Sequence, residues 1–155
     1  MKYLRFFLFP FSVLYGCIMS VRNFLYTINV FESRSYPIPI ICVGNLNTGG
    51  TGKSPMIELL IKTLQKQHHI ATLSRGYKRT TTGFLEVESH HTTTEVGDEP
   101  LQFKTNFPEI TVAVDANRRR GVAELLKKHP QLDLILLDDA FQHRKVKADL
   151  NVLLT

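Results

Sequence analysis

The sequence predicts an α/β domain with a mostly parallel sheet and helices on both faces, preceded by an apolar N-terminal helix. Two observations support this fold class. Short apolar segments without polar alternation recur along residues 37–155, which is typical of strands buried on both faces. Segments with apolar residues at helical spacing separate them, as in parallel strands joined by helices. Large apolar side chains dominate residues 1–36 instead, so we expect two domains, 1–36 and 37–155.

The composition is that of a globular protein, with 43% apolar and 21% charged residues in a chain of 155. The formal net charge of +5 is unevenly distributed. Four basic side chains and one acidic side chain give residues 1–36 a charge of +3, which leaves only +2 for the remainder. Because the basic surplus lies beside the apolar N-terminus, it indicates anionic lipid and not nucleic acid as a partner.

Residues 1–36 are predicted to form a membrane-associating helix and a linker. Pro10 suits the first turn of a helix, and a helix from Pro10 to about Val30 would be about 30 Å long, near the thickness of a bilayer core. Arg22 and Asn23 make a complete span costly. We therefore expect an amphipathic helix that lies partly in the membrane interface. An apolar helix packed on the domain and a true span are the alternatives.

A Gly-rich loop follows the first predicted strand, Ile38 to Val43, and precedes a helix from Ser54 to about Gln67. In this context glycines let backbone N–H groups point at phosphate oxygens, a lysine reaches the outer phosphates, and a hydroxyl can ligate magnesium. Asn47 stands where the pattern G-x-x-x-x-G-K-[ST] has its first glycine, and a flexible turn is the alternative. The context favours a P-loop NTPase-like fold. The predicted nucleotide-binding residues are Asn47, Thr48, Gly49, Gly50, Thr51, Gly52, Lys53 and Ser54.

The remaining predicted elements are strands and helices. They are a strand over 70–73, a β segment over 84–87, a helix over 98–106, a strand over 111–114, a helix over 117–128, a strand over 132–139 and a strand over 150–154. The chain ends within this last apolar segment, with no covering helix after it. We therefore expect the domain 37–155 to be truncated at its C-terminus.

Acidic side chains stand where a nucleotide site needs them. Asp138 and Asp139 end an apolar strand, and ligands of open parallel sheets bind at the carboxyl ends of strands. An acid in this position holds magnesium directly or through water, although either residue could instead cap a turn. Asp98 lies in a Gly-containing turn before a helix, where it is either an N-cap or the base that accepts a proton from an attacking hydroxyl.

Each of two further motifs has two interpretations that the sequence leaves open. Arg118, Arg119 and Arg120 form either a solvated helix face or an anion-binding group. His143 is either a site residue or a histidine held within a turn.

Together these motifs resemble the lipid A 4′-kinase (tetraacyldisaccharide 4′-kinase) family. The blocks that carry the resemblance, in the family's order, are Leu14-Tyr15-Gly16, Val43-Gly44-Asn45-Leu46, Gly49-Gly50-Thr51-Gly52-Lys53-Ser54-Pro55, Leu73-Ser74-Arg75-Gly76-Tyr77, Val96-Gly97-Asp98-Glu99-Pro100-Leu101, Asp115-Ala116-Asn117-Arg118 and Leu137-Asp138-Asp139-Ala140-Phe141-Gln142-His143-Arg144. The family's loop often lacks the first glycine, so Asn47 fits. Ala140 stands where the family usually has a glycine. Ser54 replaces the threonine that is commoner in the family and keeps its hydroxyl group.

The resemblance implies a lipid kinase that moves the γ-phosphate of ATP to the 4′-hydroxyl of a tetraacylated glucosamine disaccharide 1-phosphate, in lipid A biosynthesis. It implies ATP and Mg²⁺ as cofactors and Asp98 as the general base. It also implies a peripheral or monotopic enzyme on the cytoplasmic face of the bacterial inner membrane, with no nucleic acid and no obligate protein partner. Ser54, Glu99, Asp138 and Asp139 are similar to the family's metal-binding residues.

The family is about twice as long as this chain, and its C-terminal half supplies a histidine that pairs with the base. We therefore expect doubtful activity from residues 1–155 alone. Two other functions stay open. A P-loop ATPase switch of the partitioning or septum-placing class also uses GGxGK[ST], but carries a signature lysine where this chain has Thr48. A membrane-tethered nucleotide-binding module without turnover is the other.

Overall fold

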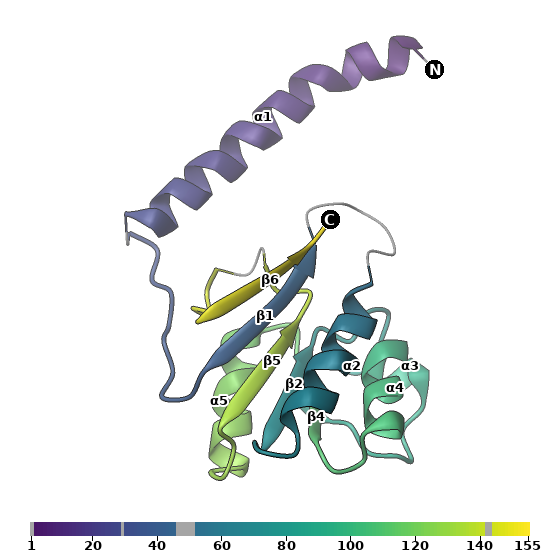
Figure 1. The fold of residues 1–155 in the computed structure, drawn as a ribbon. Coiled ribbons are helices and arrows are strands. Elements are labelled where there is room, and N and C mark those ends of the chain that lie inside the picture. The colour runs from purple at the N-terminus through teal and green to yellow at the C-terminus, as the bar shows by residue number, and fades with distance from the viewer. Residues whose placement is uncertain (1, 29, 46–51, 142–143) are drawn as a thin grey trace. The chain divides into compact units, whose positions relative to one another are not determined.

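The computed structural model describes residues 2–28, 30–45, 52–141 and 144–155, and the chain divides into two units, Met1–Ser33 and Arg34–Thr155 (Figure 1). The first unit consists mainly of one helix, α1 (Lys2–Thr27). The helix begins eight residues before the predicted start at Pro10. A proline removes one backbone hydrogen bond, and a helix of 26 residues tolerates this loss.

Large apolar side chains are exposed along α1 and the residues that follow it, among them Phe9, Leu14, Ile18 and Phe24. At the end of the unit the ring of Tyr26 is buried and contacts Phe31 edge-on, with 5.3 Å between the ring centroids. Over the described part of the chain, no helix combines the length and the hydropathy that crossing a bilayer requires.

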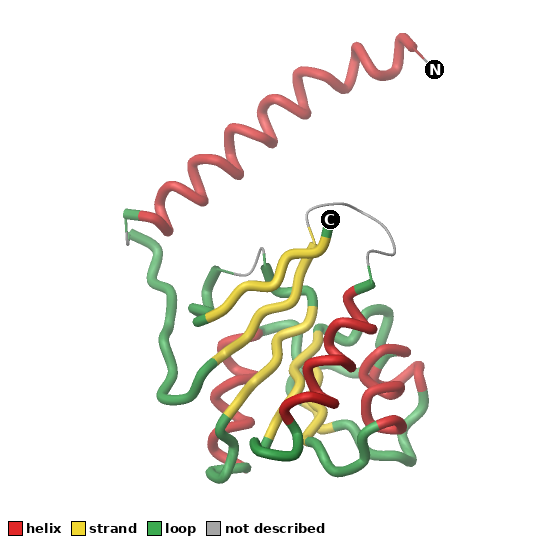
Figure 2. The backbone as a smooth tube through the Cα atoms, viewed as in Figure 1, coloured by secondary structure: helices red, strands yellow, loops and turns green. Residues whose placement is uncertain are grey.

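The second unit contains a six-stranded sheet of order β3-β4-β2-β5-β1-β6 (Figure 2). Every pair of neighbours is parallel except β3 and β4, which are antiparallel. The strands are β1 (Ile40–Asn45), β2 (Ile70–Ser74), β3 (Leu85–Glu86), β4 (Thr111–Val114), β5 (Leu134–Asp138) and β6 (Leu150–Leu154). This confirms the predicted fold class of a mostly parallel sheet with helices.

Helices cover both faces of this sheet. They are α2 (Lys53–Leu64), α3 (Thr93–Val96), α4 (Asp98–Asn106) and α5 (Arg118–Lys128). Successive strand residues point to opposite faces, so Leu136 joins the hydrophobic core beneath α2 and α4, while Ile135 and Leu137 join the core beneath α5. Two buried layers explain why the central strands carry no polar alternation.

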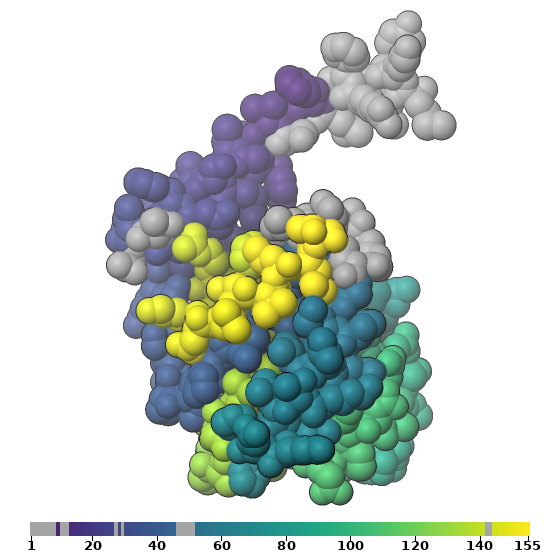
Figure 3. All heavy atoms as spheres, in the orientation of Figure 1, coloured from purple at the N-terminus to yellow at the C-terminus, as the bar shows by residue number. Residues whose placement is uncertain are grey.

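The edge strand β6 is less buried than the others. Leu150 and Leu153 are 53% and 39% exposed, and the space-filling view shows the strand open at the surface beside α2 (Figure 3). A parallel strand at an edge keeps unpaired backbone groups on its outer side. β6 is therefore an exposed edge strand in the described part of the chain.

Candidate active site

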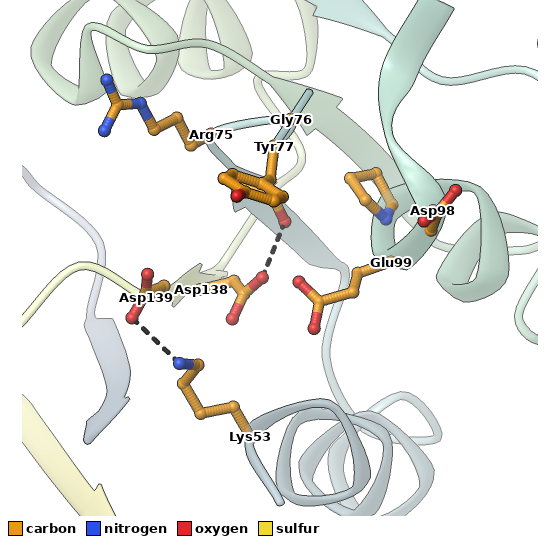
Figure 4. A pocket seen from close by; sticks show the side chains of 10 residues that line it. Lys53, Arg75, Gly76, Tyr77, Asp98, Glu99, Asp138 and Asp139 are labelled. Atoms are coloured by element: carbon orange, nitrogen blue, oxygen red, sulfur yellow. Dashed lines mark hydrogen bonds and ion pairs between the residues drawn. The ribbon is translucent and has the colours of Figure 1, made fainter. Parts of the chain in front are cut away.

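One cavity of about 520 Å³ lies where the carboxyl ends of β2 and β5 meet the beginnings of α2 and α4 (Figure 4). Parallel strands bring their carboxyl ends to the same edge of a sheet, which is why segments distant in sequence meet here. The lining residues are Lys53, Ser74, Arg75, Gly76, Tyr77, Asp98, Glu99, Pro100, Asp138 and Asp139.

Lys53 is the first residue of α2 and bridges two elements. Its Nζ lies 3.2 Å from Asp139 Oδ1 and donates a hydrogen bond to Asn45 Oδ1 at 3.1 Å. The helix begins after Gly52, whose φ of 81° is in the left-handed region that favours glycine. A lysine at a helix N-terminus adds its charge to the helix dipole, so this corner is suited to an anion.

Only part of the predicted nucleotide loop falls within the described residues. Gly52, Lys53 and Ser54 are described. Gly52 precedes α2, Lys53 begins it, and Ser54 contacts Glu99. The predictions for Asn47, Thr48, Gly49, Gly50 and Thr51 lie outside the described residues, as does that for His143.

Ser54 and Glu99 join the two helices at the cavity. The Ser54 hydroxyl donates a hydrogen bond to Glu99 Oε1 at 2.6 Å. Glu99 is the second residue of α4 and Asp98 is the first, while Gly97 occupies the N-cap position. Asp98 therefore does not cap this helix, contrary to one of its two interpretations, and its exposed side chain borders the cavity.

Asp138 is the most deeply buried acid of the site, with 3% of its surface exposed. Its Oδ2 accepts a hydrogen bond from Ser74 Oγ at 3.3 Å, whereas its buried Oδ1 has no hydrogen-bond partner in the described part of the chain. Burial, with the nearby charges of Glu99 and Asp139, raises the pKa of Asp138 to about 7. An orphaned buried oxygen beside two other carboxylates fits a divalent cation, which would relieve both penalties.

The described residues contain no group of three or more histidine, cysteine or acidic side chains arranged to hold a metal ion. Glu99, Asp138 and Asp139 nevertheless border one cavity, and Ser54 is bonded to the first of them. Magnesium usually keeps several waters and takes one or two carboxylates together with the phosphates of its substrate. A complete protein cage is therefore not required for these residues to fit Mg²⁺.

Arg118 is a buried residue that bonds to the backbone of the site. It is 3% exposed, and its guanidinium donates to the backbone carbonyls of Asp115 at 2.6 Å and of Asp138 at 3.0 Å. Arg120 pairs with the Asp115 carboxylate through Nε at 2.7 Å. The interpretation of this helix as a solvated basic face is therefore wrong for Arg118, because its guanidinium is buried and bonded to backbone carbonyls.

Sequence reasoning missed the contributions of Ser74 and Asn45. Both stand at the carboxyl ends of strands, the position that identified Asp138 and Asp139. Their position at a strand end was therefore the signal that could have found them. Their contacts depend on the fold, because Ser74 bonds to Asp138, 64 positions away, and Asn45 to Lys53, 8 positions away.

The fold and this arrangement define an α/β domain of the P-loop class. The sequence model of a family described as "Tetraacyldisaccharide-1-P 4'-kinase" matches residues 4–155. The chain therefore belongs to the tetraacyldisaccharide 4′-kinase family. This confirms the resemblance and removes the assignment to the partitioning or septum-placing ATPases.

Curated relatives and one solved structure agree with this family. A tetraacyldisaccharide 4′-kinase of Flavobacterium psychrophilum is 54% identical over 155 residues, which are 100% of this chain and 45% of the relative. One of Bacteroides thetaiotaomicron is 49% identical over 149 residues, covering 96% and 39%. The crystal structure of the "apo" form of LpxK from Aquifex aeolicus in complex with ATP superimposes with a TM-score of 0.87 at 39% identity, covering 97% of this chain and 48% of that one. The chain thus spans less than half the length of these relatives.

Proposed function

We propose that the chain carries the nucleotide site of a kinase that transfers the γ-phosphate of ATP to the 4′-hydroxyl of a tetraacylated glucosamine disaccharide 1-phosphate. One observation carries the proposal: a lysine at a helix N-terminus and four acidic side chains border a single cavity in a chain of this family. Phosphoryl transfer depends mainly on positioning and on electrostatic stabilisation, and these groups supply both.

The reaction assigns a role to each side of the cavity. The 4′-oxygen forms a bond to the γ-phosphorus while the bond from that phosphorus to the oxygen of ADP breaks. Lys53 binds the outer phosphates and stabilises the charge that moves onto ADP. Asp98, exposed at the start of α4, accepts the proton of the 4′-hydroxyl. Its exposure leaves it accessible to a bulky acceptor.

Mg²⁺ would be held by Ser54, Glu99, Asp138 and Asp139, the residues whose fit to a cation is described above. When bound, the ion neutralises charge on the phosphates. Before that, the Ser54–Glu99 hydrogen bond keeps α2 and α4 together at the site. Ser74 and Arg118 hold Asp138 through its side chain and its carbonyl, respectively.

The proposed location is the cytoplasmic face of the bacterial inner membrane, with the protein peripheral or monotopic. Support comes from the exposed apolar side chains of α1 and from the net positive charge of residues 1–36. A substrate with four acyl chains stays in the bilayer, so the kinase must reach it there. A bilayer surface is thus the proposed partner besides the lipid substrate.

The test is a transfer assay with labelled ATP and the acylated disaccharide 1-phosphate in detergent micelles. It is run on this chain and on the Flavobacterium psychrophilum relative, of which the chain spans 45%. Formation of the bis-phosphate, lost in Lys53→Ala and Asp98→Asn, supports the kinase. ATP hydrolysis without transfer to the acceptor by both proteins would contradict the proposal, and binding without turnover by both proteins would indicate a nucleotide-binding module.

A further inference from the structure

Gly44 and Phe141, two residues of the recognised motifs, have no role in the site described so far, yet they contact one another. Gly44 is buried in β1, and Phe141 follows β5. A methyl group in place of a Gly44 hydrogen would lie 2.6 Å from Phe141 Cβ, 3.4 Å from its backbone nitrogen and 3.6 Å from its Cα. The first distance is well below carbon–carbon contact. All three atoms belong to or adjoin the backbone, so no side-chain rotation can relieve the overlap.

The topology explains why the two segments approach so closely. β1 lies between β5 and β6, so the chain that leaves β5 must cross β1 before it can form β6. It turns at Asp139, whose φ of 48° is in the left-handed region that non-glycine residues rarely adopt. Ala140 is buried in the core beneath α5, and Phe141 then lies directly against Gly44.

The same crossing places Asp139 at the cavity. Its carboxylate lies 3.2 Å from Lys53 Nζ, and Lys53 also bonds to Asn45, the neighbour of Gly44 in β1. Strand β1, the crossing segment (residues 139–141) and Lys53 thus form a closed ring of contacts. Moving the crossing segment away from β1 would open this ring at Asp139.

We propose that Gly44 is a positioning residue: the absence of its side chain lets Phe141 lie against β1 and thereby holds the Asp139 carboxylate toward Lys53 and the nucleotide's metal. This rests on the proposed nucleotide site. A methyl group on residue 44 forces the crossing segment outward, and Asp139 moves with it because only Ala140 separates it from Phe141. The proposal assigns a common purpose to two motif blocks whose residues Gly44 and Phe141 lie 97 positions apart.

The experiment measures ATP affinity by calorimetry for this 155-residue chain, with and without magnesium. Gly44→Ala should weaken Mg-ATP binding roughly ten-fold or more, the order of one charge-assisted hydrogen bond, and should lose most of the gain that magnesium provides. Adding Phe141→Gly removes the Cβ that the new methyl group meets, so the double variant should recover most of the affinity relative to Phe141→Gly alone. Adding Phe141→Ala retains that Cβ and should not restore binding.

A matched control separates positioning from loss of stability. Gly121→Ala overpacks another site, because its methyl group would lie 2.7 Å from Leu73 Cδ2 in the core beneath α5. It should lower the melting temperature without changing Mg-ATP affinity. Equal affinity of Gly44→Ala and the parent, or failure of Phe141→Gly to restore it, overturns the proposal. So does an equal loss of affinity in Gly121→Ala at a comparable melting temperature.

A second measurement needs no nucleotide. In protein labelled with ¹³C at aspartate carboxyl groups, the Asp139 resonance is assigned by its loss in Asp139→Asn. It should shift in Gly44→Ala and return in Gly44→Ala/Phe141→Gly. If the parent fails to bind Mg-ATP, the proposed function is wrong, while the resonance still decides the positioning role: an unchanged Asp139 signal in Gly44→Ala would refute it.

Discussion

Lys53 is held by two oxygens, Asn45 Oδ1 and Asp139 Oδ1, and 20% of its side chain is exposed. Lys53→Ala should weaken Mg-ATP binding by about ten-fold or more, because the outer phosphates lose a charged donor. The free energy of unfolding should change by no more than about 1 kcal/mol, since partly exposed ion pairs contribute little. Calorimetry and thermal unfolding measure the two effects.

Lys62 provides the control on the same helix. It lies in the last turn of α2, 62% exposed, with Glu58 Oε2 3.9 Å away. Lys62→Ala removes the same charge at the far end of the helix and should leave nucleotide affinity unchanged. Parent-like affinity of Lys53→Ala would argue against a phosphate site at the start of α2.

The raised pKa of Asp138 predicts how the stability of the domain depends on pH. Folding raises its pKa from 3.8 to about 7, so between these values the folded state binds more protons than the unfolded state. Stability should therefore fall as the pH rises from about 4 to about 7, and above pH 7 the whole cost remains. Asp138→Asn should accordingly raise the melting temperature at pH 8 by several degrees, given about 2–4 °C per kcal/mol, and change it little at pH 4.

Magnesium offers a second readout of the same residue. Added Mg²⁺ at pH 8 should stabilise the parent, because it neutralises the crowded carboxylates, and should stabilise Asp138→Asn less. In the longer Flavobacterium psychrophilum relative, the corresponding aspartate-to-asparagine variant should lose phosphoryl transfer far more than ATP binding, since the metal contributes most to the transition state. A variant less stable than the parent at pH 8 would show that ionised Asp138 carries no penalty.

At the scale of single residues, the sequence predicted what local motifs determine. Lys53 follows a Gly-rich loop and Asp138 ends an apolar strand, so both could be placed from their neighbours. The burial of Arg118 could not be predicted, because its partner carbonyl on Asp138 is 20 positions away. The contact of Gly44 with Phe141 was missed for the same reason: it depends on which strand the chain crosses.

At the scale of elements, polar contacts join α2 to α4 along their exposed sides. Glu58 Oε1 accepts hydrogen bonds from Gln102 Nε2 at 2.8 Å and from Asn106 Nδ2 at 3.1 Å. Glu58→Ala should destabilise the domain by about 1 kcal/mol and speed amide exchange in α4. Glu88→Ala, at an exposed acid outside both helices, is the control. Unchanged exchange in α4 would mean that the apolar core alone holds it.

Prediction of the elements succeeded where periodicity was strong. The strands of the parallel sheet were found because two covered faces leave no polar alternation. The short helix α3, with its Thr92–Glu95 capping box, was not predicted, because four residues contain too little periodicity. The start of α1 was misplaced because Pro10 was read as a boundary.

At the scale of the molecule, residues 1–33 form a unit with a positive charge and exposed apolar side chains. The protein should sediment with vesicles containing anionic lipid, and binding should weaken at high salt because basic side chains contribute. A variant without residues 1–33 should stay in the supernatant. Equal sedimentation of both proteins would place the lipid-binding surface in residues 34–155.

The sheet order also determines when the nucleotide site can assemble during synthesis. β1 is made early, yet both of its neighbours come late: residues 135–138 of β5 on one side and 150–154 of β6 on the other. At about 5–20 residues per second, the ribosome needs roughly 5–20 s to progress from β1 to β6. Until β5 is made, the apolar strand before the phosphate loop has no partner, and until β6 is made one of its edges stays open. Nascent chains that end before β5 should therefore depend on chaperones and bind no nucleotide.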